Sequence, residues 1–258
     1  MSEPSIGRAR RCAVMALITA GVLSMQAQAG PVALQSSTNQ VTLLELFSSE
    51  GCSSCPPAEK WLSALKTSPG LWKDFVPVSF HVDYWNYLGW RDPWSSKAFS
   101  DRQRLYARHW GGHSIYTPGF VLNGREWSDW QPQADHPTAR HVNAGVLQAS
   151  SPDLEHWVVS FSPALQARSD YEVSVAMLAG GLVSDVGAGE NRGRRLVHDF
   201  VVTSLTTRSL KRQNDKWEAE FAIKAPSAQA KGRQAVAVWV TQVGSLEPVQ
   251  AVGGWASN

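Results

Sequence analysis

Residues 41–57, VTLLELFSSEGCSSCPP, bring two cysteines directly after an apolar run. The first seven of these residues are mostly leucine, valine and phenylalanine, which is typical of a buried β-strand. Two prolines and a helical apolar pattern follow the second cysteine, and proline is well tolerated in the first turn of a helix. The stretch therefore predicts a strand over 41–47 that leads into a Cys-x-x-Cys pair at the start of a helix over 56–66.

The two cysteines, Cys52 and Cys55, have the spacing of a redox-active pair. We expect Cys52 at the N-terminus of the helix, where free backbone N–H groups and the helix dipole favour a thiolate over a thiol. Cys55, one turn further, would then attack a mixed disulfide on Cys52. Two other interpretations stay open: half of a zinc site, although no second cysteine pair follows, and an inert structural disulfide.

The first 29 residues have the pattern of a secretory signal peptide. Three arginines precede an apolar run over 13–25, and the small-residue sequence AQA ends at Ala29. This order predicts a Sec-type signal peptide over 1–29, cleaved near Ala29, and the apolar run is too short to span a bilayer. We therefore expect a periplasmic or secreted protein with no membrane span after cleavage.

The composition is that of a folded chain without a strongly charged surface. Of 258 residues, 43% are hydrophobic and 18% are charged, which allows a core and argues against disorder. Residues 1–29 contain three of the 24 Lys and Arg and one of the 22 Asp and Glu. The remainder is therefore close to neutral, which predicts no nucleic-acid binding. Cys52 and Cys55 alone remain after cleavage, and such a pair favours exchange with protein thiols or disulfides, including those of a redox partner protein.

Three ionisable residues near the cysteines are candidates for supporting roles. Glu45 lies in the first predicted strand, where it could relay a proton to the cysteines or simply reach solvent at the strand end. His81 and Asp83 lie two residues apart in the second predicted strand, hence on one face. With His109 or His113 this pair could bind a metal ion, but no recognised motif is matched, so the sequence predicts neither a metal site nor a cofactor.

The middle of the chain predicts a strand, an aromatic segment and a helix. The second strand, over 75–82, runs into an aromatic-rich segment over 81–94, and a helix over 95–112 follows with Ser95 or Ser96 as its cap. The aromatic residues, tryptophans above all, would either pack against the sheet or form a groove that grips a protein substrate.

A β-hairpin is predicted next. Asn123-Gly124 between two apolar runs is a two-residue turn signal, and Thr117-Pro118 stands at the start of the first strand, where proline is tolerated. A last helix over 138–148 is expected to close this part of the chain.

This order of elements resembles the thioredoxin fold over about residues 38–150. The resemblance implies a cis peptide bond between Thr117 and Pro118, with Pro118 against the cysteine pair, where it shapes the substrate-binding backbone. It also implies that Cys52 attacks and that Cys55 resolves the mixed disulfide.

The chain departs from that pattern at two places. Gly51 stands where thioredoxins have tryptophan, and Glu45 lies one residue further from the first cysteine than the buried acid of thioredoxins. More narrowly, the sequences LFSSEGCSSCPPAE, HVDYWNYLGWRDPW and YTPGFVLNG resemble a secreted, thioredoxin-like family of Gram-negative bacteria of unassigned function, domain of unknown function 1223. This second resemblance implies a fold and a compartment but no substrate.

The chain changes character after Ser151-Pro152, where short strand candidates alternate with polar loops. Such spacing predicts a β-sandwich. The loop over 186–195, VGAGENRGRR, is expected to be a flexible hairpin loop, with contact to an anionic partner as the second interpretation. The predicted fold class is therefore an α/β thioredoxin-like domain over 30–150, a central mixed sheet flanked by helices, followed by an all-β sandwich-like domain over 151–258.

The function expected from these patterns is that of an exported thiol–disulfide oxidoreductase acting on protein substrates. The predicted catalytic residues are Cys52, Cys55 and Pro118, and the predicted supporting residues are Thr117, Glu45, His81 and Asp83. The alternative is a non-enzymatic exported binding protein or metallochaperone that holds copper or zinc through the same cysteines. Whether the enzyme oxidises, reduces or isomerises depends on its redox potential.

Overall fold

The computed structural model describes Met1 and residues 31–165, 170–223 and 232–256. The predicted signal peptide therefore lies outside the described residues, apart from Met1. About 48% of the described structure is β-strand and 13% is helix. None of the described helices is both long and apolar enough to cross a membrane.

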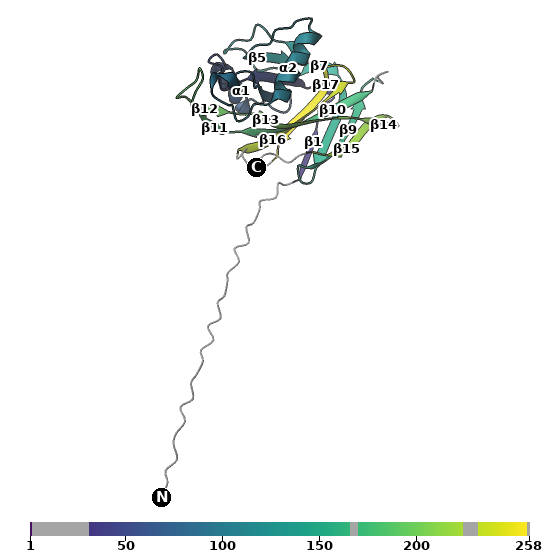
Figure 1. The fold of residues 1–258 in the computed structure, drawn as a ribbon. Coiled ribbons are helices and arrows are strands. Elements are labelled where there is room, and N and C mark those ends of the chain that lie inside the picture. Colours follow the sequence, from purple (N-terminus) through teal and green to yellow (C-terminus); the bar gives the residue numbers. More distant parts are fainter. Residues whose placement is uncertain (2–30, 166–169, 224–231, 257–258) are drawn as a thin grey trace.

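The largest sheet of the described chain has eight strands, drawn from both parts of the sequence (Figure 1). The first part supplies β3 (Thr42–Ser48), β4 (Phe75–His81), β5 (Gly119–Leu122) and β6 (Arg125–Glu126). The second part supplies β10 (Tyr171–Gly180), β13 (Val201–Ser209), β16 (Arg233–Gln242) and β17 (Pro248–Trp255). Their order in space is β17-β16-β10-β13-β4-β3-β5-β6.

The junction between β4 and β13 makes this sheet continuous. The two strands run parallel, with Ser79 opposite Val201, and the N–H of Ser79 donates a 2.8 Å hydrogen bond to the carbonyl of Phe200. Phe47 from the first part and Trp239 from the second belong to the same buried cluster. The two parts of the chain therefore share both a sheet and a core.

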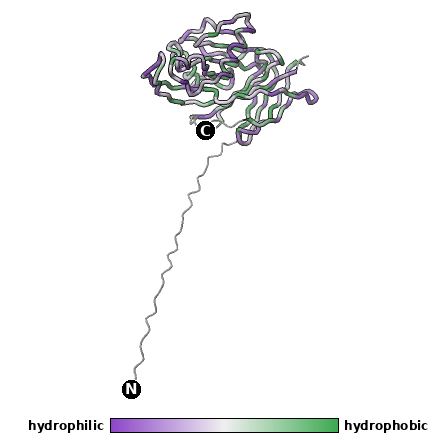
Figure 2. Tube along the Cα trace, viewed as in Figure 1, coloured by the Kyte–Doolittle hydropathy of each residue, from purple (hydrophilic) through white to green (hydrophobic). Residues whose placement is uncertain are grey.

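A second sheet of five strands packs on one face of β10, β16 and β17. Its strands are β1 (Val32–Gln35), β8 (Gly145–Ser151), β9 (His156–Pro163), β14 (Lys211–Gln213) and β15 (Lys216–Ala222), in the order β1-β8-β9-β15-β14. Trp157 and Phe161 of β9 lie in one buried cluster with Tyr171 and Val238 of the large sheet. Figure 2 shows that the edge of the molecule beside β14 is hydrophilic, as expected for an exposed edge.

Two helices cover opposite faces of the β3–β4 part of the large sheet. Ala58 and Leu62 of α1 (Pro56–Ala64) pack with Leu44 and Leu46, whereas α2 (Lys97–His109) packs on the face that carries Phe47. Successive residues of a strand point to opposite faces, so β3 supplies a core to each helix. Ser96 caps α2 by accepting a hydrogen bond from Ala98 N–H, as one of the two predicted caps.

Short 3₁₀ turns and small hairpins complete the described elements. The 3₁₀ turns are η1 (Leu65–Thr67), directly after α1, and η2 (Asn86–Leu88). β2 (Asn39–Gln40) pairs with β7 (Arg140–Asn143), and β11 (Leu182–Asp185) pairs with β12 (Arg195–His198). The predicted hairpin turn at Asn123-Gly124 is confirmed: both residues have positive φ, 47° and 82°, between β5 and β6.

The predicted fold class, an α/β thioredoxin-like domain followed by an all-β sandwich-like domain, is wrong. The described structure is β-rich with only two α-helices, and strands from both parts extend one sheet. A sheet flanked by helices was expected because the local pattern around the cysteines indicated one. Over β10, β16 and β17 the covering layer is instead the five-stranded sheet.

The helix expected over 138–148 is also wrong, because this segment forms β7 and β8. Burial along β8 alternates: Leu147 and Ala149 are buried, whereas Gln148 and Ser150 are exposed. Pairing with β1 and β9 on either side outweighs the weak helical preference of the sequence. The predicted domain boundary near residue 150 falls at the end of β8, and the division into domains stays a prediction.

Candidate active site

Cys52 and Cys55 lie in the turn between β3 and α1 and are joined by a disulfide, with their Cα atoms 5.5 Å apart. Both are buried, with exposed fractions of 1% and 0%. The helix begins at Pro56 as predicted, but Cys55 is its N-cap residue and Cys52 lies one turn earlier. The expectation that Cys52 stands at the helix N-terminus is therefore wrong. The helix starts only after the second cysteine, because the two consecutive prolines that follow it are favoured in the first helical turn.

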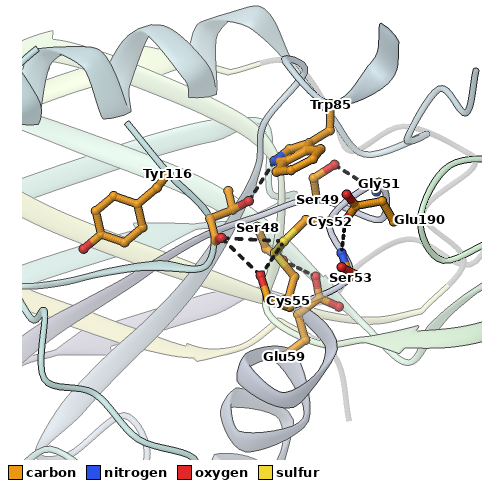
Figure 3. Close-up of a disulfide and its surroundings, with 12 residues drawn as sticks. Ser48, Ser49, Gly51, Cys52, Ser53, Cys55, Glu59, Trp85, Tyr116 and Glu190 are labelled. Carbon is orange, nitrogen blue, oxygen red and sulfur yellow. Dashed lines mark hydrogen bonds between the residues drawn. A yellow bond between two sulfur atoms is a disulfide. The ribbon is translucent and has the colours of Figure 1, made fainter. Parts of the chain in front are cut away.

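The segment that begins at Tyr116 lies against the cysteine pair (Figure 3). The carbonyl oxygen of Thr117 is 3.7 Å from Sγ of Cys52 and accepts a 3.4 Å hydrogen bond from the hydroxyl of Ser54. The indole N–H of Trp85 donates a 2.8 Å hydrogen bond to the hydroxyl of Thr117. The peptide bond between Thr117 and Pro118 is cis, as the resemblance implied. Two segments more than sixty residues apart in the sequence thus form one surface.

Tyr116 extends this surface away from the disulfide. Its carbonyl accepts a 2.7 Å hydrogen bond from Gln103, and its hydroxyl donates a 2.6 Å bond to Glu126. Partial burial and the neighbouring Glu126 carboxylate raise the pKa of Tyr116 to about 12, so the phenol stays protonated at neutral pH. A cavity of about 160 Å³ lies beside it, with Trp110 and other aromatic side chains in its walls.

The loop over residues 186–194, between β11 and β12, covers the cysteine turn. Glu190 accepts a 2.8 Å hydrogen bond from the N–H of Ser53. Asn191 is fully buried, and its side-chain amide donates to the carbonyls of Glu50 and Cys52 at 2.9 and 2.8 Å. The hydrogen bonds from Ser53 lower the pKa of Glu190, so this carboxylate is ionised where it meets the cysteine turn. This segment was expected to be a flexible hairpin loop, and it forms a cover over the site.

Five buried ionisable residues, which we call the buried charge cluster, gather beside the disulfide: Glu50, Glu59, His81, Asp92 and His198. Nδ1 of His81 is 2.7 Å from Asp92, and Nε2 of His198 is 3.0 Å from Glu50. Nδ1 of His198 is hydrogen-bonded to Glu59, whose other oxygen accepts from the hydroxyl of Ser48. Figure 3 shows Glu59 rising from α1 toward Ser48 and the disulfide.

Ion pairing dominates the titration of this cluster. Burial opposes a charge on His198, but the carboxylates of Glu59 and Glu50 outweigh it and raise the pKa of His198 to about 10. Burial likewise opposes a charge on Glu59, yet His198 and His81 hold its pKa below the usual range. The pKa of His81 is raised, against the effect of burial, by Asp92 and Glu59. For both histidines and for Glu59, ion pairing therefore outweighs the effect of burial.

Two of the predicted supporting residues lie away from the cysteines. Glu45 points to the α2 face of the sheet, where it forms a 2.7 Å ion pair with Arg102 and accepts a hydrogen bond from Tyr106. Asp83 follows the end of β4 and is hydrogen-bonded to Ser100 of α2. Its side chain therefore contacts α2, whereas His81 contacts Asp92 and Glu59 of α1, so the two residues do not share a face as predicted.

The remaining metal candidates do not meet His81 either. His109 and His113 are exposed, and His81 instead faces Glu59, which is 3.7 Å from its Nε2 atom.

The tryptophans of the middle of the chain fill both expected roles, some at the site and some packed against the sheet. Trp85 contacts Thr117 and Trp90 donates a 2.6 Å hydrogen bond to Glu50 at the site. Trp127 and Trp130 pack with Trp61 and Phe120 on the α1 face of the sheet.

Sequence reasoning missed Glu59, Glu50, His198 and Asn191. For Glu59 a signal was present: it stands four residues after Cys55 and three before Leu62, so it shares the buried face of the helix. His198 lies two residues after buried Leu196 in a short strand, hence on the same face, which is a weaker signal. Nothing in the sequence indicated that Asn191 and Glu50 come together, because 141 positions separate them.

Comparison with solved structures supports the fold. A crystal structure of a protein from Agrobacterium tumefaciens is similar over 85% of this chain and 95% of that one, with a TM-score of 0.55 and 24% sequence identity. HBP35 of Porphyromonas gingivalis is similar over 85% of this chain and 76% of that one, with a TM-score of 0.56 and 15% identity. At these identities the likeness concerns the fold alone.

Comparison at the level of sequence identifies the family. No curated protein matched the chain. The pattern of the family described as "Protein of unknown function (DUF1223)" matches residues 43–241, which include the cysteine pair, the Thr117-Pro118 segment and every residue of the buried charge cluster. The chain belongs to the DUF1223 family.

Proposed function

We propose that the chain is an exported thiol–disulfide oxidoreductase that acts on protein thiols or disulfides through Cys52 and Cys55. The observation that carries this proposal is the disulfide itself, held against the carbonyl of Thr117 at 3.7 Å from Sγ of Cys52. A disulfide that only staples a fold needs no such partner segment. The proposal concerns chemistry of the kind that thioredoxins perform, without their fold.

The proposed reaction exchanges one disulfide for another. In the reduced enzyme the Cys52 thiolate attacks a substrate disulfide, a bond forms between Cys52 and one substrate sulfur, and the other substrate sulfur leaves as a thiolate. Cys55 then gives up its proton and attacks Cys52, which releases the second substrate thiolate and forms the Cys52–Cys55 disulfide. Two electrons pass to the substrate, and its two thiolates take up protons; the reverse sequence oxidises a substrate dithiol.

The roles of the two cysteines follow from their positions. Cys52 is the sulfur that meets the Thr117 carbonyl beneath the covering loop, whereas Cys55 is the N-cap residue of α1. The helix dipole stabilises a thiolate at Cys55, which makes it a good leaving group when a substrate thiolate attacks Cys52. Pro118 has no N–H and begins the strand segment that leads to β5, so it shapes the backbone that a substrate would meet.

Access to Cys52 requires the 186–194 loop to move. Glu190 and Asn191 fasten this loop to the cysteine turn through Ser53, Glu50 and Cys52. A substrate chain could reach Cys52 once these bonds open, which would give the loop control over reactivity.

Export is the other element of this proposal. Its support is the pattern of charged, apolar and small residues over 1–29. The mass of the mature protein, isolated after expression with its leader in a Gram-negative host, should correspond to a chain that begins near Gly30. Recovery of the uncleaved chain from the cytoplasm would contradict export.

The catalytic proposal is tested by trapping. Reduced Cys55→Ser protein, mixed with a disulfide-bonded protein substrate, should accumulate a mixed disulfide on Cys52. Dithiothreitol should reduce this bond and release the substrate. Cys52→Ser is the matched control and should form little adduct, because opening of the loop uncovers Cys52 and leaves Cys55 at the N-cap of α1. Absence of any adduct on Cys55→Ser, or adducts formed equally by both variants, would refute the assigned roles.

A further inference from the structure

We propose that Glu59, His81 and His198 form a binding site for a divalent transition-metal ion, with zinc as the expected ion. The three residues come from α1, from the end of β4 and from the end of β12. Each offers one ligand atom, and these atoms lie within 4.8 Å of one another. This site is separate from the cysteines and does not depend on the proposed redox function.

An unpartnered nitrogen points to a missing ligand. Nε2 of His81 belongs to a fully buried side chain and has no hydrogen-bond partner among the described residues. The carboxylate of Glu59 lies 3.7 Å from this nitrogen, which is too long for a hydrogen bond. Buried polar atoms normally have a partner, so a ligand bound between His81 and Glu59 would account for this one.

The outer contacts of both histidines are those of metal ligands. Metal-binding histidines usually donate their second ring N–H to a carboxylate, which orients the ring. Nδ1 of His81 meets Asp92 at 2.7 Å, and Nε2 of His198 meets Glu50 at 3.0 Å. The remaining nitrogens, Nε2 of His81 and Nδ1 of His198, both face Glu59.

The outer carboxylates are themselves fixed. Asp92 accepts hydrogen bonds of 2.9 Å from the backbone N–H groups of Glu50 and Trp94. Glu50 accepts a 2.6 Å bond from the indole of Trp90, and Ser48 donates to Glu59. Each of the three ligand side chains is therefore held by its own buried partner, and an ion would take the place of the hydrogen bond between His198 and Glu59.

The charge of the cluster suits a divalent cation. Three carboxylates, those of Glu50, Glu59 and Asp92, surround two imidazoles, and all are at least nine-tenths buried. Two imidazoles with one carboxylate are a ligand set that zinc accepts, with water completing its coordination.

The test uses a Cys52→Ser, Cys55→Ser double variant, so that no thiolate can bind the ion. After removal of metals, titration with Zn²⁺ followed by gel filtration and elemental analysis should give about one zinc per chain. Glu59→Gln, His81→Gln and His198→Gln in this background should each weaken binding at least tenfold, and Asp92→Asn should weaken it about 10–100-fold. His156→Gln is the matched control, because His156 also pairs with a carboxylate, Asp153, but lies on the surface.

Several outcomes would overturn the proposal. These are no zinc in the double variant, unchanged affinity in His81→Gln and His198→Gln, or zinc bound only when the cysteines are intact. The last outcome would favour the metallochaperone alternative. If a histidine variant fails to fold, Co²⁺ bound to the double variant is used instead. A visible Co²⁺ spectrum with imidazole ligands and without a thiolate charge-transfer band would support the site. No such spectrum would refute it.

Discussion

Asn191→Ala should make the Cys52–Cys55 disulfide much more reactive, because Asn191 holds the covering loop closed. Its side-chain amide donates hydrogen bonds to two carbonyls of the cysteine turn, and its own oxygen accepts a 2.8 Å bond from Arg194. The carbonyl of Cys52 keeps a second donor, the N–H of Cys55 at 3.3 Å. Among the described residues, the carbonyl of Glu50 would be left with no donor while the loop is closed.

The magnitude follows from that one carbonyl. Leaving a buried acceptor unsatisfied costs about 1–3 kcal/mol. The open form of the loop does not bear this cost, because water reaches the carbonyl there. Opening should therefore become easier by about the same free energy, which corresponds to a rate increase of roughly 5- to 150-fold when opening precedes the reaction.

The assay is the rate at which dithiothreitol reduces the disulfide, followed by rapid alkylation and mass spectrometry. Arg192→Ala is the matched control, because Arg192 lies in the same loop with an exposed side chain. It should react at the rate of the unaltered protein. Equal rates for Asn191→Ala and Arg192→Ala would refute the idea that this loop limits access. Denaturant unfolding of both variants, run in parallel, separates local opening from loss of the whole fold.

Two further predictions concern structural positions. Glu45→Ala removes the partner of Arg102, whose side chain is 15% exposed, and should lower the free energy of unfolding by about 3–5 kcal/mol without changing the rate of disulfide reduction. Glu126→Ala, at an exposed position, is the control, and its free energy of unfolding should stay within about 0.5 kcal/mol of that of the unaltered protein. A slower disulfide reaction in Glu45→Ala would instead support a proton relay. Gly124→Ala should lower stability by about 1–3 kcal/mol, because φ is 82° and the added Cβ would stand 2.7 Å from Cα of Glu247; an unchanged melting temperature would show that the turn can relax.

The local features of the site were readable in the sequence. The apolar run before Cys52, the prolines after Cys55 and the turn at Asn123-Gly124 all predict elements that the structure contains. Each depends on residues within a few positions of one another, where alternation, capping and turn chemistry act directly. The resemblance added the cis peptide bond between Thr117 and Pro118.

The fold class and the buried charge cluster depend on contacts that local pattern does not encode. The helix expected over 138–148 became strands because β1 and β9 pair on both sides of β8. The expected layered α/β domain became part of an eight-stranded sheet because β13 pairs with β4.

By itself the sequence determined the strand, the cysteine turn and the helix after it, since these are set by periodicity and backbone chemistry over short distances. Only the tertiary structure decided which acid accompanies the cysteines: Glu45, the candidate from sequence, pairs with Arg102, whereas Glu59 meets His198 across 139 positions. The physical reason is that a buried charge is stable only beside a partner. Which partner reaches it depends on how α1, β4 and β12 pack together, and no single segment carries that information.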